Sequence, residues 1–108
     1  RLVQITFVQP NGSRKTIDAS EGASVMETAV SHGVDGIFAE CGGAMMCATC
    51  HCYVDEAWSD KTGARTDGEE IMLECAAADL RETSRLSCQI RLTGALDGLV
   101  VHLPDEQA

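Results

Sequence analysis

The hydrophobic pattern of the first twenty residues predicts two paired β-strands. The run 2–8, LVQITFV, is rich in β-branched and aromatic residues with partial alternation, and the run 14–19, RKTIDA, can pair back on it. Between them, Pro10, Asn11 and Gly12 form a strong turn signal. We therefore expect the chain to open with an antiparallel hairpin.

A helical pattern follows at 24–32, SVMETAVSH. Ser24 can cap the first turn, Glu27 three residues later completes a capping box, and Gly33 favours an end to the helix. The apolar stripe at helical spacing consists of Val25, Met26, Ala29 and Val30. This stripe is expected to face the core.

The second half of the chain predicts three further strands and one more helix. The strands are expected at 51–54, at 85–92 with Cys88 on it, and at 99–103, which Pro104 ends. The helix is expected to begin at Asp67, a plausible N-cap. The stretch 40–50 shows neither the helical nor the strand periodicity of apolar residues, which predicts an irregular loop. Strands mixed with helices, after an antiparallel hairpin, indicate the α+β class.

Length and composition indicate one globular domain, which we take as 1–108. The apolar content of 44% argues against disorder, and no apolar run approaches the ~18 residues of a membrane span. Because the N-terminus has no basic, apolar leader pattern, we expect mature or leaderless protein. The net charge of −9 disfavours nucleic acid and suits basic protein partners.

The negative charge is concentrated in 55–82, which holds nine acidic and three basic residues. On the predicted helix, Asp67, Glu70 and Glu74 fall on one stripe, which we expect to be exposed. The opposite arc, expected to pack inward, consists of Ile71, Met72, Cys75 and Ala76. Taken alone, the acidic row is equally compatible with a solvated face that keeps the protein soluble.

The most specific signal is the spacing of the cysteines. Cys41, Cys47 and Cys50 follow the pattern C-x5-C-x2-C, and Cys88 comes 38 positions later. Three thiolates on one loop and a fourth from a distant strand can enclose an iron–sulfur core. The sulfides of such a core need hydrogen-bond donors, and the pair Gly42–Gly43 lets backbone N–H groups approach closely.

Two other uses of these cysteines are less favoured. A structural zinc site usually takes two short C-x2-4-C pairs, and only one such pair is present. A disulfide framework is expected in secreted proteins, and no secretory signal is visible. The spacing therefore favours a 2Fe–2S cluster. Cys52 and Cys75 match no ligand position, and we expect a strand thiol and a helix-core thiol without redox roles.

The stretches CGGAMMCATCHCYV, EEIMLE, SRLSCQI and LDGLVVHLPD resemble the vertebrate-type 2Fe–2S ferredoxins, the adrenodoxin- and putidaredoxin-like family. The resemblance covers essentially the whole chain. It is strongest to the bacterial members that serve cytochrome P-450 monooxygenases. Plant-type ferredoxins separate their first two ligands by four residues, so the five residues here favour the adrenodoxin-like branch.

The resemblance implies a β-grasp fold that holds one 2Fe–2S cluster under a thin loop. It implies that His51 braces this loop, with Gly42 and Gly43 supporting the loop itself. The implied ligands are Cys41, Cys47, Cys50 and Cys88. The residues implied to dock on a partner are Glu40, Asp67, Glu69, Glu70 and Glu74.

The resemblance also implies a function. The protein is expected to be a one-electron carrier and not an enzyme, a monomer that forms transient complexes. Its expected partners are an FAD-containing, NAD(P)H-dependent ferredoxin reductase and a cytochrome P-450; the alternative is electron donation to iron–sulfur cluster assembly. The expected location is the cytoplasm of a bacterium, or the mitochondrial matrix if the source is eukaryotic. Three residues, Glu40, Gly68 and Ala108, differ from those that shape recognition of the monooxygenase in the family's camphor-oxidising system. A different monooxygenase is therefore expected as the partner.

Overall fold

The fold is built on a mixed five-stranded sheet with the strand order β2-β1-β5-β3-β4. The computed structural model describes residues 2–34, 50–76 and 78–105. Strand β1 (Leu2–Val8) pairs antiparallel with β2 (Arg14–Ser20) and parallel with β5 (Leu99–His102). Strand β3 (His51–Val54) lies antiparallel between β5 and β4 (Ser84–Leu86). This topology confirms the expected α+β class and the β-grasp fold.

The opening hairpin has the form that the sequence predicts. Ile5 pairs with Ile17 in its middle, and Gly12 adopts a φ of 89° in the connecting turn. A left-handed φ of this kind favours glycine, which explains the turn signal before β2. On β1, alternate residues point into the core, so that Val3, Ile5 and Phe7 are fully buried.

Helix α1 (Val25–Ser31) is capped as predicted. The Ser24 side chain accepts a hydrogen bond from the Glu27 backbone N–H, and the Glu27 carboxylate accepts one from the Ser24 N–H. The helix ends before Gly33, whose φ is 65°. Its inward face differs from the expected stripe at two positions, because Thr28 is buried and Val30 is 51% exposed. The Thr28 hydroxyl is satisfied by donating to the Ser24 carbonyl.

The predicted strand at 85–92 is wrong in extent. Only Ser84–Leu86 forms a strand, and the chain then tightens into the 3-10 helix η1 (Ser87–Gln89). Cys88 therefore lies on a tight turn and not on a strand. Such a turn moves the Cys88 side chain out of the alternating pattern of β4. A further 3-10 helix, η2 (Gly94–Leu96), precedes β5.

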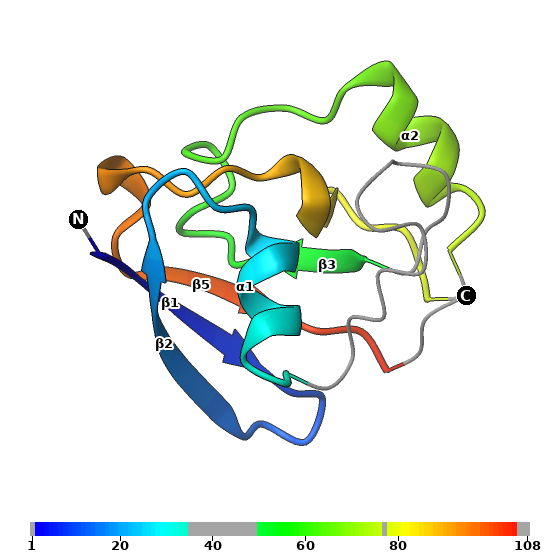
Figure 1. Ribbon diagram of the computed structural model, residues 1–108. Coiled ribbons are helices and arrows are strands. Elements are labelled where there is room, and N and C mark those ends of the chain that lie inside the picture. The colour runs from blue at the N-terminus through cyan, green and yellow to red at the C-terminus, as the bar shows by residue number, and fades with distance from the viewer. Residues whose placement is uncertain (1, 35–49, 77, 106–108) are drawn as a thin grey trace.

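Helix α2 (Asp67–Leu73) begins one residue earlier than an Asp67 cap requires. The N-cap is Thr66, whose side chain accepts from the Glu69 N–H, while Glu69 accepts from the Thr66 N–H. Helix α2 lies well apart from α1 (Figure 1). It packs against β4, and its residue Leu73, which is 1% exposed, joins the hydrophobic core.

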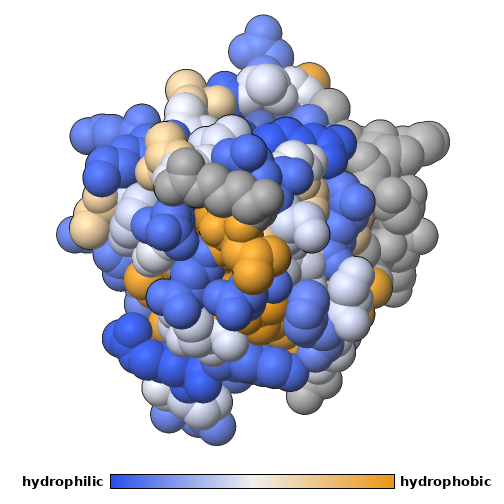
Figure 2. All heavy atoms as spheres, turned by 60° about the vertical axis from the view of Figure 1, so that its left-hand side comes forward, coloured by the Kyte–Doolittle hydropathy of each residue, from blue (hydrophilic) through white to orange (hydrophobic). Residues whose placement is uncertain are grey.

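One hydrophobic core joins the sheet, α1 and the end of α2. Among the described residues, the large exposed hydrophobics are Leu2, Val30, Ile71 and Leu80. The face drawn in Figure 2 is mostly hydrophilic, with a hydrophobic area near its centre and smaller hydrophobic spots around it. In the described part of the chain, no helix has the length and apolar character needed to cross a membrane.

Candidate metal centre

Two of the four predicted ligands meet inside the protein. Cys50 precedes β3 and is fully buried, Cys88 on η1 is 5% exposed, and their Sγ atoms lie 3.5 Å apart without a disulfide. Thiolates bind a tetrahedral metal ion at about 2.3 Å, which places two of them about 3.8 Å from each other. The Cys50–Cys88 pair therefore fits two ligands of one metal ion.

Ser87 holds the two cysteine segments together. Its backbone N–H donates to the Cys50 carbonyl at 2.9 Å, and its hydroxyl donates to the same oxygen at 2.8 Å. Ser87 is fully buried, so these bonds do not compete with water. Because Ser87 directly precedes Cys88, its two hydrogen bonds to the Cys50 carbonyl fix the distance between the Cys50 and Cys88 thiols.

The environment of Cys88 favours a thiolate. The Cys50 thiol beside it lowers the pKa of Cys88 to about 6, and the Gln89 side-chain amide, which donates to the sulfur at 3.4 Å, acts in the same direction. Burial instead raises the pKa of Cys52 to about 12. Metals bind the thiolate form of cysteine. The two neighbouring buried thiols are thus chemically distinct, as expected for a ligand and a strand thiol.

His51 is held in the neutral form at the base of this site. Burial first, then the charges of Arg81 and Arg65, lower its pKa to about 4. Its Nε2 lies 2.9 Å from the Ser84 hydroxyl on β4, and that hydroxyl also accepts from the Arg81 N–H. His51 therefore ties β3 to β4 next to Cys50. Its expected contact with the cluster loop concerns residues outside the described ones.

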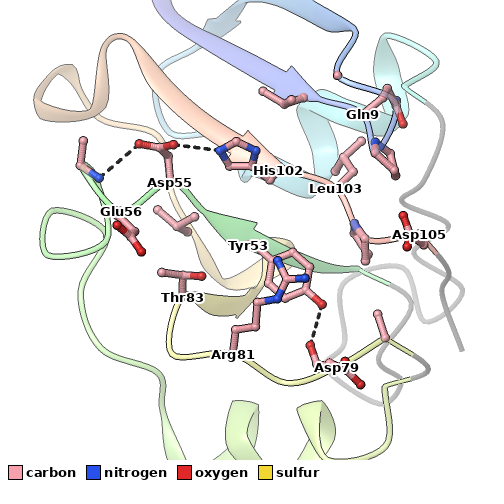
Figure 3. Close-up of a pocket in the computed structure, with 17 residues that line it drawn as sticks. Gln9, Tyr53, Asp55, Glu56, Asp79, Arg81, Thr83, His102, Leu103 and Asp105 are labelled. Atoms are coloured by element: carbon pink, nitrogen blue, oxygen red, sulfur yellow. Dashed lines mark hydrogen bonds and ion pairs between the residues drawn. The ribbon is translucent and has the colours of Figure 1, made fainter.

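A groove lies beside this network, between the end of β5 and the 78–83 segment (Figure 3). Its polar groups pair with one another. Asp55 accepts at 2.8 Å from Nε2 of His102, and this bond is the main reason why the pKa of Asp55 is lowered. Tyr53 donates to the Asp79 carbonyl at 2.6 Å, and the Arg81 guanidinium covers its ring.

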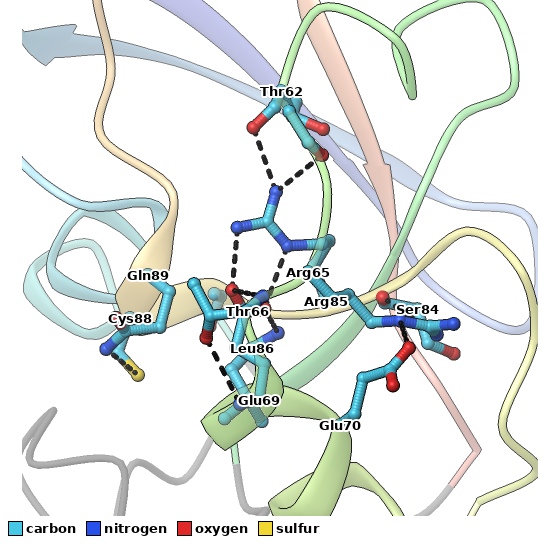
Figure 4. Close-up of polar contacts among 12 residues, drawn as sticks. Thr62, Arg65, Thr66, Glu69, Glu70, Ser84, Arg85, Leu86, Cys88 and Gln89 are labelled. Atoms are coloured by element: carbon cyan, nitrogen blue, oxygen red, sulfur yellow. Dashed lines mark hydrogen bonds and ion pairs between the residues drawn. The ribbon is translucent and has the colours of Figure 1, made fainter.

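Glu69 corrects one of the predicted docking residues. It is fully buried, and its carboxylate binds the Arg85 guanidinium through two hydrogen bonds of 2.8 and 2.9 Å. The same carboxylate accepts from the Leu86 N–H, and Arg85 also donates to the Thr62 carbonyl (Figure 4). The Glu69 side chain cannot contact a partner. It instead fastens α2 to β4, two residues before Cys88.

The exposed face of α2 is otherwise acidic, as the sequence predicts. Asp67, Glu70 and Glu74 are all exposed, and Glu70 lies 3.4 Å from Arg65. The predicted inward arc is wrong at two positions: Ile71 is 61% exposed and Cys75 is also exposed. The helix turns Glu69 and Leu73 inward, so Ile71 shares the outer face with the acids.

Several predicted site residues lie outside the described part of the chain. These are Glu40, Cys41, Gly42, Gly43 and Cys47. Conversely, the structure adds Ser84, Arg85, Ser87 and Gln89 to the surroundings of the site. Only their closeness in sequence to Cys88 could have pointed to them. Their roles depend on contacts with residues 16 to 37 positions away, apart from Gln89.

Comparisons with known proteins agree with this geometry. Residues 8–93 match the model of the 2Fe-2S iron-sulfur cluster binding domain. The chain is 47% identical over 106 residues to putidaredoxin of Pseudomonas putida, covering 98% of this chain and 99% of that one. It superimposes on the crystal structure of a ferredoxin from Rhodopseudomonas palustris HaA2 with a TM-score of 0.95, at 46% identity, over 97% and 99% of the chains.

A third likeness is to a complex. The putidaredoxin chain in the crystal structure of the covalent putidaredoxin reductase–putidaredoxin complex matches with a TM-score of 0.92, at 47% identity, over 95% of this chain and 99% of that one. The protein thus belongs to the 2Fe–2S ferredoxins, in the putidaredoxin-like branch. It binds one 2Fe–2S cluster and is an electron-transfer protein rather than an enzyme.

Proposed function

We propose that this ferredoxin carries single electrons from an FAD-containing, NAD(P)H-dependent ferredoxin reductase to a cytochrome P-450 monooxygenase. The observation that carries the proposal is the buried Cys50–Cys88 thiol pair in a chain that matches putidaredoxin over nearly its whole length. The solved complex of putidaredoxin with its reductase supports the first half of this route.

The proposed cluster ligands are Cys41, Cys47, Cys50 and Cys88. When bound, the cluster supplies a site that accepts and returns one electron. Ser87 sets the separation of Cys50 and Cys88, and Gln89 donates to the Cys88 sulfur. His51 is neutral at neutral pH and ties the strand after Cys50 to β4. No residue in this scheme transfers a proton.

We assign docking to the exposed acids Asp67, Glu70 and Glu74, and to Glu40 by resemblance. A row of negative charge attracts a basic partner over roughly 8–10 Å at ordinary ionic strength. It raises the rate of encounter more than the strength of the complex. The transient complexes of an electron carrier need this property. The carrier is proposed to act as a monomer in the bacterial cytoplasm.

The test is reconstitution of a complete electron-transfer chain. Purified ferredoxin is mixed with a ferredoxin reductase, NAD(P)H and each candidate P-450 from the same cell, and substrate oxidation is measured. We expect turnover that requires the ferredoxin and is lost with Cys88→Ser. A holoprotein that the reductase reduces, but that supports only cluster assembly on a scaffold protein and no P-450, would overturn the proposal in favour of the assembly role.

A further inference from the structure

We propose that Gln89 sets the reduction potential of the cluster through its hydrogen bond to the sulfur of Cys88. The side-chain Nε2 lies 3.4 Å from Cys88 Sγ (Figure 4). Glutamine amide nitrogen carries only hydrogens and has no acceptor site, so the sulfur is the acceptor. The inference rests on the proposed ligation by Cys88, and it is independent of which monooxygenase is served.

The position of Gln89 makes this bond a stable feature. Gln89 ends the 3-10 helix η1, and its neighbours Cys88 and Ile90 are 5% and 2% exposed. The turn is closed by the Ile90 N–H, which donates to the Ser87 carbonyl, and Ser87 is anchored to Cys50. The backbone on both sides of Gln89 is therefore fixed. Although the Gln89 side chain is half-buried and water is within reach, its amide turns back to the sulfur.

The electrostatic consequence follows from the charge of the cluster. Reduction adds one negative charge, part of which is shared with the ligand sulfurs, and an N–H donor at a sulfur stabilises that charge. The Gln89 amide should therefore favour the reduced form and raise the potential. Glu69, a charged group that acts on Cys88 from α2, is neutralised by Arg85 in a buried ion pair. Gln89 is then the principal polar side chain at Cys88 among the described residues.

The experiment measures the midpoint potential of the holoprotein by spectroelectrochemistry. Gln89→Met keeps the length of the side chain and removes the donor, and Gln89→Glu replaces the donor by a negative charge. We expect both variants to have lower potentials, with Gln89→Glu shifted further. A tenfold change in the one-electron equilibrium corresponds to about 59 mV, and we expect Gln89→Met to stay within that range. Resonance Raman bands of the iron–thiolate bonds should shift as well.

Gln4→Met is the matched control, because Gln4 is an exposed glutamine on β1. Its potential should equal that of the native protein. If Gln89→Met does not hold the cluster, Gln89→Asn, which keeps the amide on a shorter arm, is measured instead and should also show a lower potential. A native potential in cluster-loaded Gln89→Met or Gln89→Asn overturns the inference. Full cluster retention in Cys88→Ser would instead overturn the proposed ligand set.

Discussion

At the scale of single residues, Ser87 and His51 determine how the two described ligand cysteines, Cys50 and Cys88, are positioned. Ser87 binds the Cys50 carbonyl with both its N–H and its hydroxyl, and His51 binds Ser84 on the neighbouring strand. All three side chains are fully buried. Lost hydrogen bonds here are not replaced by water, so their cost is that of an unsatisfied buried group.

The cysteines themselves provide the first prediction. Cys50→Ser and Cys88→Ser, and likewise Cys41→Ser and Cys47→Ser, should purify with little or no cluster, because a hydroxyl is a poor substitute for a thiolate on iron. Cys75→Ser, which changes an exposed thiol, should retain two irons and two acid-labile sulfides per chain. Iron and sulfide assays with the visible spectrum check this. A colourless native protein with one zinc ion would contradict it.

The hydrogen bond between His51 and Ser84 provides the second prediction. His51→Ala should lower the free energy of unfolding of the holoprotein by at least the roughly 1 kcal/mol of one hydrogen bond, with a further loss from the cavity. A double-mutant cycle with Ser84→Ala, measured in urea, isolates the coupling between the two side chains. Additive losses in the cycle would show that the two side chains do not stabilise each other.

At the scale of elements, α2 is a short helix whose position depends on one carboxylate. Glu69 completes the Thr66 capping box, pairs with Arg85 and accepts from the Leu86 N–H. Breaking a buried pair by removing one partner leaves an uncompensated charge, which typically costs about 3–5 kcal/mol. Stability here therefore depends far more on Glu69 than on its exposed neighbours.

We accordingly expect Glu69→Gln to lower the free energy of unfolding by about 3 kcal/mol or more, measured by urea denaturation. Glu70→Gln on the same helix should change it by less than about 1 kcal/mol, because Glu70 is exposed beside Arg65. The pair replacement Glu69→Leu with Arg85→Met should recover much of the loss, since no buried charge then remains unpaired. Equal losses for Glu69→Gln and Glu70→Gln would contradict the assignment of a buried clamp.

The elements also show which parts of the structure can be predicted from the sequence. Local signals sufficed for the hairpin at Gly12 and for the Ser24–Glu27 capping box, because both are determined within four residues. The 3-10 turn at Cys88 could not be predicted, since it depends on Ser87 bonding to Cys50, 37 positions away. The resemblance places Glu69 among the docking acids, and no local pattern reveals its buried partner Arg85, which is 16 positions away. The spacing of the ligand cysteines can be recognised in the sequence, whereas the residues that support the ligands cannot, because their contacts are distant in sequence.

At the scale of the whole molecule, the net charge of −9 and its uneven distribution determine how the protein attracts a basic partner. The exposed acids of α2 contribute little to folding, because exposed charges interact weakly through water. We expect Glu74→Lys, or Asp67→Asn combined with Glu70→Gln, to leave the visible spectrum and the melting temperature nearly unchanged. Both should raise the Michaelis constant for the ferredoxin in reductase assays, since the attraction to a basic partner is weakened.

Ionic strength separates steering from a specific contact in this prediction. The difference between native and variant protein should shrink as salt is added, because screening removes the same attraction from the native protein. Steady-state titrations at low and high salt measure this. Asp18 is an exposed residue on β2, away from α2 (Figure 1), and Asp18→Lys changes the net charge as much as either variant, so it serves as the control for net charge alone. Identical kinetics at low salt would show that the acidic face only keeps the protein soluble.

The Glu69–Arg85 clamp finally bears on how long a complex lasts. Because α2 is fastened to β4 before any partner arrives, the acidic face does not have to be ordered on binding. Pre-ordered surfaces associate quickly, and an interface that relies on charge rather than on large buried area also separates quickly. A carrier must visit two proteins in each cycle, so its throughput is limited by departure as much as by arrival. The buried ion pair that holds the helix in place thus favours fast arrival, and the reliance on surface charge favours short residence on each partner.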